Sequence, residues 1–261
     1  MCMDKVVITI ADKTTPIMVL LGSPTSGKNL MLVRMTEYLR QLGYNVFPDG
    51  SFRSQDLSYQ RDCQDFHKII YSRDFGGKSW RFMLLKVING EGHSVCQFLK
   101  FPGSLFYDHS SPEHSFPRFI NDICMLQNRK TWMFIVEENW GSSQMERDSY
   151  AKKIIDMQDM ISKQDKVVFV CNKVDCSEFI LSNGHPDKNK IFRKIQSQYP
   201  HIFDKYLNSN SIIRLFSPYK FDFVTFSAGC FNKTYDGRYI FTSGEDFYPK
   251  QLWQSIKSSI H

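Results

Sequence analysis

The sequence predicts an α/β fold, in which a mostly parallel sheet is covered by helices on both faces. Short apolar runs of strand length alternate along the chain with segments of helical periodicity. Two of the apolar runs, 17–21 and 167–171, each lead directly into a polar loop. The 261 residues suffice for a domain of this class with a large core.

The first predicted strand and helix lie on either side of a glycine-containing loop. The strand covers 17–21, and apolar side chains then recur at helical spacing over 28–42 until Gly43 ends the pattern. Residues 44–79 are polar and aromatic, with few periodic apolar positions. We therefore expect a long loop or a partly ordered insertion there.

A hairpin and a helix are predicted next. Strands at 80–88 and 95–100 flank Asn89-Gly-Glu-Gly92, and Asn-Gly between apolar runs is a strong hairpin signal. Ser110 followed by Glu113 has the spacing of a capping box. A helix from there to about residue 128 is the expected continuation.

The second half of the chain continues the alternation of strands and helices. The expected elements are a strand at 131–137, a helix at 143–162, a strand at 166–171, a helix at 187–198 that breaks at Pro200 and resumes to about 207, a strand at 221–226, a hairpin-like insertion at 231–245 and a helix at 248–260. No internal repeat or low-complexity linker interrupts this order. We therefore expect one domain over residues 1–261.

Composition and charge limit the classes of partner. The net charge of +6 is spread along the chain, and the basic cluster at 188–194 has no interleaved aromatic residues, so we expect a solvated helix face there and no nucleic-acid partner. The longest apolar run, 17–21, is far below the ~20 residues needed to cross a bilayer, so no membrane span is expected. The 7 cysteines form no Cys-x-x-Cys pair, which favours free thiols and a cytoplasmic location.

The loop after the first strand has the composition of a phosphate-binding loop. Its residues are Gly22, Ser23, Pro24, Thr25, Ser26, Gly27, Lys28 and Asn29. Backbone N–H groups at a helix N-terminus bind an anion, the helix dipole adds to the attraction, and the lysine reaches the terminal phosphates. A glycine-rich strand-to-helix turn with a surface lysine is the purely structural alternative.

The second loop, Asn172-Lys-Val-Asp175, follows a predicted strand as well. Together the two loops resemble those of the Ras-like P-loop GTPases, over residues 17–260. The resemblance implies that Asp175 accepts two hydrogen bonds from guanine, that Asn172 ties this loop to the P-loop, that the stem of Lys173 covers the ring, and that a Ser-Ala pair touches the guanine oxygen. The residues expected to bind the base are Asn172, Lys173, Asp175, Ser227, Ala228 and Gly229. GTP or GDP is the expected ligand.

The residues that hold Mg²⁺ in that family are replaced in this chain. Asn29 stands where a Ser or Thr hydroxyl normally coordinates the metal, so we expect weakened metal binding at Asn29 or a nucleotide bound without Mg²⁺. The family's Asp-x-x-Gly motif reads Lys100-Phe-Pro-Gly103. Gly103 can still donate its N–H to a γ-phosphate, whereas Lys100 replaces the aspartate. We hypothesise that its ammonium group partly replaces the missing cation.

Two further family residues are missing. No threonine occurs between residues 36 and 131, so the switch threonine that closes over Mg²⁺ is absent. Ser104 stands at the position of the water-orienting glutamine. Because hydrolysis depends on the metal and on a positioned water, turnover is expected to fall while binding survives.

The sequence therefore predicts a guanine-nucleotide-binding switch or interaction module with weak or absent GTP hydrolysis. Candidates for any catalysis are Lys28, Lys100 and Ser104, and candidates for an arginine finger within the insertion are Arg53, Arg61 and Arg73. A protein partner would contact the insertions at 44–79 and 231–245.

Three alternatives remain open at this point. One is an active GTPase in which Asn29 and insertion residues rebuild the metal site. A second is a pseudo-GTPase scaffold that binds no nucleotide. The third is an ATP-using P-loop kinase. The acidic pair Glu137-Glu138 ends a strand and could be mistaken for a Walker-B site, but Asn172-Lys-Val-Asp175 argues against that assignment.

Overall fold

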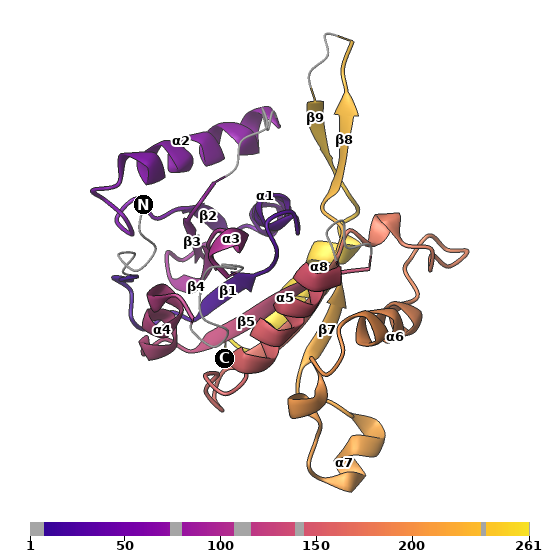
Figure 1. The fold of residues 1–261 in the computed structure, drawn as a ribbon. Coiled ribbons are helices and arrows are strands. Elements are labelled where there is room, and N and C mark those ends of the chain that lie inside the picture. The colour runs from indigo at the N-terminus through magenta and orange to yellow at the C-terminus, as the bar shows by residue number, and fades with distance from the viewer. Residues whose placement is uncertain (1–7, 74–79, 107–115, 139–143, 236–238, 261) are drawn as a thin grey trace.

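The computed structural model describes residues 8–73, 80–106, 116–138, 144–235 and 239–260. Its centre is a 7-stranded sheet with the strand order β2-β3-β4-β1-β5-β6-β7 (Figure 1). The strands are β1 (Ile17–Leu21), β2 (Asn45–Pro48), β3 (Met83–Ile88), β4 (Ser94–Lys100), β5 (Lys130–Glu137), β6 (Lys166–Asn172) and β7 (Asp222–Thr225). β8 (Gly229–Lys233) and β9 (Tyr239–Ser243) pair in a separate hairpin.

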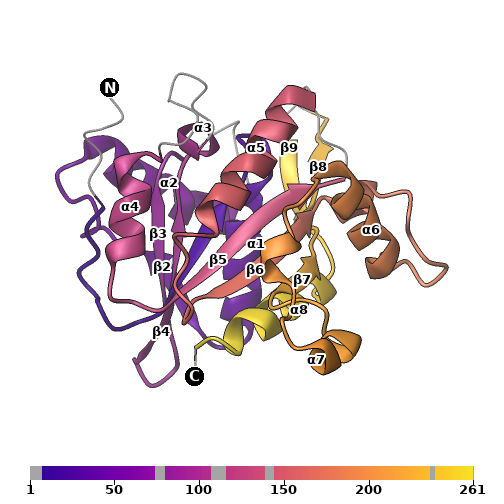
Figure 2. The same ribbon diagram turned by 60° about the horizontal axis from the view of Figure 1, so that its bottom comes forward.

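Helices cover both faces of the sheet. They are α1 (Lys28–Gln41), α2 (Leu57–Ser72), α3 (Gly103–Phe106), α4 (Arg118–Met125), α5 (Gln144–Met157), α6 (Lys188–Gln198), α7 (Ser211–Phe216) and α8 (Phe247–Lys257). Figure 2 shows α4, α5 and α6 in front of the sheet, while α1 and α2 lie behind it. α8 packs against β7 and α1 and completes the second layer.

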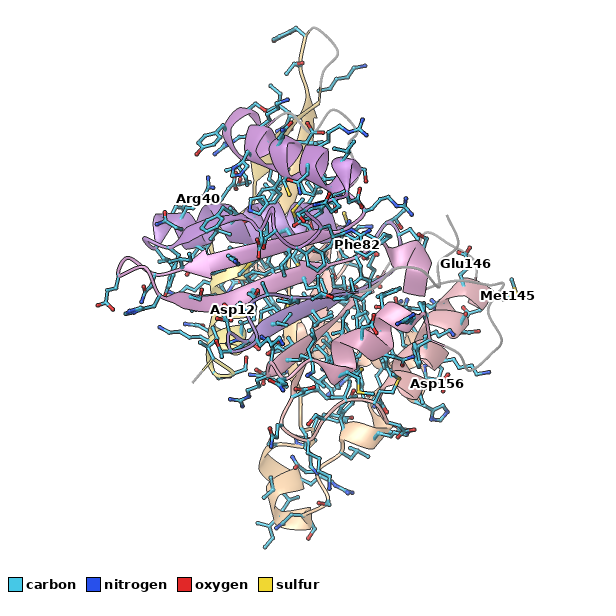
Figure 3. The ribbon with its side chains drawn as sticks, turned by 90° about the vertical axis from the view of Figure 1, so that its left-hand side faces the viewer. Asp12, Arg40, Phe82, Met145, Glu146 and Asp156 are labelled. Carbon is cyan, nitrogen blue, oxygen red and sulfur yellow. The ribbon has the colours of Figure 1, made fainter. Side chains whose placement is uncertain are left out.

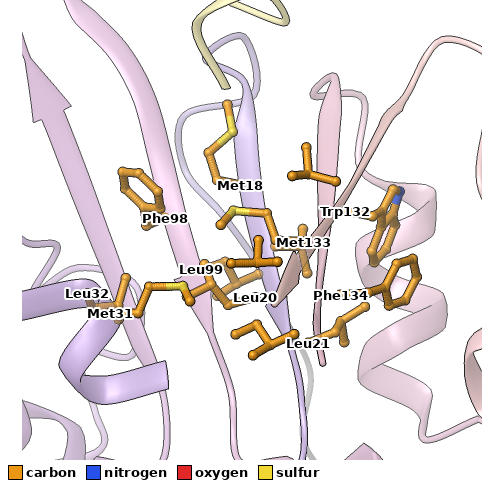
Figure 4. Packing of buried hydrophobic residues seen from close by; sticks show 14 of the residues in the cluster. Met18, Leu20, Leu21, Met31, Leu32, Phe98, Leu99, Trp132, Met133 and Phe134 are labelled. Atoms are coloured by element: carbon orange, nitrogen blue, oxygen red, sulfur yellow. The ribbon is translucent and has the colours of Figure 1, made fainter. Parts of the chain in front are cut away.

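The central strands are apolar because they are buried on both faces. All five residues of β1 are buried, and so are all eight of β5. Figure 4 shows Met18 and Leu20 of β1 among Leu99 of β4 and Met133 of β5. Continuous apolar runs of this kind are typical of parallel strands that helices cover on both sides.

The topology confirms the predicted fold class. β1 pairs in parallel with β4 and β5, and β5, β6 and β7 continue the parallel order. β3 runs antiparallel to β4 across the turn that Asn89 begins, and β2 adds an antiparallel edge strand to β3. The loops that follow β1, β4, β6 and β7 all leave the same edge of the sheet, where ligands bind in open α/β sheets.

The expectation of a loop at 44–79 is wrong for most of that segment. β2 opens it, and α2 fills 57–72 with Tyr59, Cys63, Phe66 and Ile69 buried along one face. Asp56 caps α2 by accepting hydrogen bonds from two backbone N–H groups of the first turn. The many polar residues on the exposed face concealed this periodicity. Residues 74–79 lie outside the described part of the chain.

The helix expected from Ser110 begins later than predicted. Helix α4 starts at Arg118 after Pro117, and the proposed cap at Ser110 lies outside the described residues. After α6 the chain forms a single 3₁₀ turn at Asp204–Tyr206 and then α7, which the sequence analysis did not predict. The other helices and strands agree with prediction to within a few residues at each end, and the hairpin expected near 231–245 is present as β8 and β9.

No helix in the described ranges is long and apolar enough to cross a membrane. Figure 3 shows the side chains on the ribbon and labels Arg40, near the end of α1, and Phe82, which directly precedes β3.

Candidate nucleotide-binding site

The loop between β1 and α1 closes around the side chain of Lys28. The Lys28 ammonium donates hydrogen bonds to the carbonyl of Gly22 at 2.8 Å, to the carbonyl of Ser23 and to Ser26 Oγ at 3.1 Å. Gly27 adopts φ 79° immediately before α1, in the left-handed region that favours glycine. An entering phosphate would replace the loop carbonyls as the partner of this buried ammonium group.

One side-chain amide joins the phosphate loop to the second motif. Asn172 Nδ2 donates to the carbonyl oxygen of Ser26 at 2.8 Å, and both groups are buried. A Cβ at Gly27 would lie 2.5 Å from Asn172 Nδ2, so glycine is required for the approach. The two loops are therefore close enough to contact a single ligand.

The third predicted loop, Ser227-Ala228-Gly229, lies beside the second. Val174 donates its backbone N–H to the carbonyl of Phe226 at 3.3 Å, and Gly244 donates to the carbonyl of Ala228 at 2.9 Å. The second of these bonds fixes the base of the β8–β9 hairpin against this loop. Ser227 and Ala228 are buried.

Asp175 is exposed at the surface of this region, where a base can reach its carboxylate. The pKa of Tyr248 on α8 is raised, first by burial and then by the nearby charges of Glu245 and Asp175. Asp175 therefore lies within electrostatic range of this phenol. Lys173 has φ 60°, and its ammonium group pairs with Glu137 Oε2 at 2.5 Å.

Glu137 is a site residue to which the sequence analysis gave no role in guanine binding. It ends β5, is buried, and bonds to Lys173 and to the Ser23 side chain. Burial raises the pKa of its carboxyl group, although Lys173 and Lys28 act in the opposite direction. Its contacts form a second connection between the phosphate loop and the base-binding loop. An acidic residue at the end of a central strand was the signal available.

A cavity of about 350 Å³ opens between the phosphate loop, the start of α3 and the segment that leads into β3. Its lining residues are Pro24, Thr25, Gly27, Lys28, Asn29, Leu30, Trp80, Arg81, Lys100, Pro102, Gly103 and Ser104. Lysine and arginine supply the only charged side chains among these residues. The cavity is therefore suited to an anion.

Lys100 lies inside the wall of this cavity and is 3% exposed. Its ammonium group donates to the carbonyl of Trp80 and, at 3.4 Å, to that of Arg81. Burial lowers the pKa of Lys100 to about 8. The pKa of Lys28 falls to about 7, through burial first and then through the neighbouring charge of Lys100, while Glu137 opposes the shift.

Gly103 packs directly against the phosphate loop. A Cβ added to it would lie 2.5 Å from the backbone nitrogen of Pro24 and 2.5 Å from the carbonyl carbon of Ser23. Any side chain here would displace loop atoms, so glycine is needed for this contact. Ser104, at the position expected for a water-orienting residue, also lines the cavity.

The residues at this place do not fit a magnesium ion. Mg²⁺ takes hard oxygen ligands, mostly carboxylates, hydroxyls and water, in octahedral geometry. The cavity instead places two lysines and an arginine beside Asn29, whose side chain offers one carboxamide oxygen. Within the described residues there is no cluster of three or more His, Cys, Asp or Glu side chains that could hold a metal.

The three arginines predicted as finger candidates are occupied elsewhere. Arg53 pairs with Asp56 at 3.0 Å, Arg61 donates to a carbonyl of its own helix at 3.3 Å, and Arg73 contacts Glu37 at 3.8 Å. None of the three is among the residues that line the cavity, whereas Arg81 is. The sequence analysis overlooked Arg81 because it was assigned to the interior of a strand at 80–88.

The order of the strands brings the three loops to one edge of the sheet. No protein-family model and no curated protein matches the sequence. Solved structures resemble the chain in fold, at low identity. A protein described as nucleolar GTP-binding protein 1 from Plasmodium falciparum is 14% identical over 97% of this chain and 90% of its own, with a TM-score of 0.47.

Two further structures illustrate the same likeness. The GTPase-like domain of Ski7 from S. cerevisiae, solved with GDP and inorganic phosphate, is 15% identical over 95% of this chain and 50% of its own, with a TM-score of 0.48. The signal recognition particle receptor SRb–GTP/SRX complex from Chaetomium thermophilum contains a chain 9% identical over 94% of this chain and 98% of its own, with a TM-score of 0.43. The likeness to these structures is one of fold alone.

Proposed function

We propose that this chain binds GTP or GDP in the crevice between the phosphate loop and the base-binding loop. The observation that carries this proposal is the 2.8 Å hydrogen bond from Asn172 Nδ2 to the carbonyl of Ser26. It fixes the distance between the N–H groups that would bind phosphate and the carboxylate of Asp175 that would read the base. Two unrelated polar turns would have no reason to share a buried amide.

In this proposal Asp175 selects guanine. A carboxylate only accepts hydrogen bonds, and guanine offers two adjacent donors on its pairing edge. Adenine does not offer that pair. A site built around a buried or oriented hydrogen-bond partner rejects analogues that lack the matching group.

Hydrolysis is proposed to be slow or absent. The cavity around the phosphate loop does not fit Mg²⁺, and the short hydroxyl of Ser104 replaces a water-orienting amide. Phosphoryl transfer depends on the metal and on an aligned water. The bound GTP would therefore remain in the site with little or no hydrolysis. The chain would then act as one G domain whose bound nucleotide controls contact with a protein partner.

The surfaces proposed for that contact are α2 and the β8–β9 hairpin. The hairpin projects beyond the rest of the molecule (Figure 1) and exposes Phe231 and Tyr235. Its base is bonded to the loop that includes Ala228, so the hairpin lies next to the proposed base site.

A change of base specificity tests the proposed function directly. In Asp175→Asn the side chain gains donors where guanine also presents donors, so guanine affinity should fall by roughly a hundredfold. Xanthosine diphosphate, which presents an oxygen in place of the guanine amino group, should bind the variant better than it binds the wild type. Calorimetric titration measures both affinities, and Asp148→Asn on the exposed face of α5 is the matched control.

The same titrations separate the alternatives. Wild-type protein that binds no guanine nucleotide would be a scaffold, and a preference for ATP would indicate a kinase-like P-loop protein. A single-turnover rate that Mg²⁺ raises strongly would indicate an active GTPase with a rebuilt metal site. Equal guanine affinity in Asp175→Asn and wild type would refute base reading by Asp175.

A further inference from the structure

The phosphate cavity has one wall that the resemblance to GTPases does not explain. This wall is formed by Trp80 and Arg81, which lie in the segment that leads into β3, and it brings Arg81 to the same cavity as Lys28 and Gly103. Gly103 is the residue expected to meet the terminal phosphate, and its backbone lies against the phosphate loop. Arg81 therefore lines the same cavity as the residue expected to meet a third phosphate.

The backbone of Arg81 is held from two sides. Asp62 on α2 accepts its N–H at 3.3 Å, and the Lys100 ammonium donates to its carbonyl at 3.4 Å and to that of Trp80. The Trp80 ring is buried against Phe66 of α2, with the ring centres 5.1 Å apart. The segment is thus fixed to the sheet and to the insertion at once.

The side chain of Arg81, in contrast, is exposed. Within the described part of the chain its guanidinium group has no hydrogen-bond or ion-pair partner, whereas Arg53 on the neighbouring turn is paired with Asp56 and lies over the Phe82 ring at 4.7 Å. A guanidinium group on an anchored backbone, belonging to a residue that lines an anion cavity, is a ready phosphate ligand. Its planar fork can form two parallel hydrogen bonds to phosphate oxygens.

We propose that Arg81 binds the terminal phosphate of GTP and thereby distinguishes GTP from GDP, in the place where related domains use a magnesium ion. This inference rests on the proposed binding of guanine nucleotide. Lys28 and the loop N–H groups would hold the phosphates that GTP and GDP share, so their contribution is common to both. Arg81 would contact only the phosphate that GDP lacks.

Lys100 has a different task in this arrangement. Its ammonium group is engaged by the carbonyls of Trp80 and Arg81, so it positions the segment that carries Arg81. It adds positive charge to the cavity but need not touch the nucleotide. The sequence-based hypothesis was that the Lys100 ammonium partly replaces the cation. In the present proposal the Arg81 guanidinium replaces the cation, and Lys100 holds the backbone of Arg81 in place.

The test compares triphosphate and diphosphate affinities in EDTA. Wild type, Arg81→Met, Arg81→Lys and the control Arg61→Met are each titrated with GDP and with the hydrolysis-resistant analogue GMPPNP. Arg81→Met should lose roughly ten- to a hundredfold in GMPPNP affinity, because charge-assisted hydrogen bonds are lost, and keep the GDP affinity of wild type. The GMPPNP affinity of Arg81→Lys should lie between those of wild type and Arg81→Met. Arg61→Met should bind both nucleotides as wild type does.

Unchanged GDP binding in Arg81→Met also shows that the variant is folded. Equal losses for both nucleotides, or none for either, would overturn the role of Arg81 while leaving guanine binding intact. If wild type binds neither ligand, the proposed function itself fails and the inference fails with it.

Discussion

The side-chain amide of Asn172 connects the base-binding loop to the phosphate loop in the candidate site. Asn172 ends β6 and donates to the loop that begins α1, so two segments distant in sequence share one buried hydrogen bond. Glu137 contacts Lys173 and Ser23 and forms a second connection between the same loops. Nucleotide binding would exchange some of these internal partners for phosphate and base.

The candidate site also buries the ammonium groups of two lysine residues. Lys28 and Lys100 line one cavity, and burial lowers the pKa of each. In the folded protein without ligand each amine therefore loses its proton at a lower pH than an exposed lysine does. An anion in the cavity would favour the charged forms, which couples nucleotide binding to proton uptake above about pH 8.

Lys100 should make stability depend on pH in a defined window. Its pKa is about 8 in the folded protein against 10.5 for the ordinary group, so between these values the unfolded chain binds more protons. The free energy of unfolding should then rise with pH across this window, by up to about 1.4 kcal/mol per pH unit. Lys100→Met should reduce that rise, although Lys28, whose pKa is about 7, keeps a contribution of its own, and the exposed Lys257→Met should leave the rise unchanged. Urea unfolding from pH 7.5 to 10 measures the slopes, and parallel slopes for wild type and Lys100→Met would contradict the assignment.

At the scale of elements, α2 connects the insertion to the cavity. Its buried face carries Tyr59, whose hydroxyl donates to the carbonyl of Asp49 at 2.9 Å, and Phe66, which packs on Trp80. Asp62 on the same helix accepts the backbone N–H of Arg81. A segment that the sequence indicated as a loop is in fact the support of one wall of the cavity.

A substitution on the buried face of α2 should therefore disturb the packing beside the cavity and lower stability. Phe66 is 0% exposed, and Phe66→Ala should cost about 3–5 kcal/mol of stability through the space it leaves beside Trp80. Leu57→Ala, in the first turn of the helix and 76% exposed, should change stability by about 0.5 kcal/mol or less. Chemical denaturation compares the two, and similar costs would show that α2 does not pack as described.

The elements found from sequence were those with strong local signals. The strand β1 and the turn at Asn89 are set by an unbroken apolar run and by turn residues, and both are present. The helix α2 escaped prediction because its pattern of Tyr, Cys, Phe and Ile is buried only after it meets β3. Arg81 was missed for a related reason, since its role depends on where β3 begins.

For the whole molecule, the order of the strands brings the three motif loops to one edge of the sheet. That edge also receives the insertion through α2 and the hairpin through its bond at Ala228, so both candidate partner surfaces adjoin the site. Cationic side chains line the cavity at the phosphate loop, where the family that the sequence resembles holds its metal. The central claim that follows is guanine nucleotide binding that does not require a divalent metal.

Calorimetric titration of the wild-type protein with GTP, GDP and ATP, each in EDTA and then in Mg²⁺, tests this claim most directly. We predict that GTP and GDP bind in EDTA as tightly as they bind in Mg²⁺, and that ATP does not bind. Guanine nucleotide binding that appears only when Mg²⁺ is added, or that does not occur at all, would contradict it.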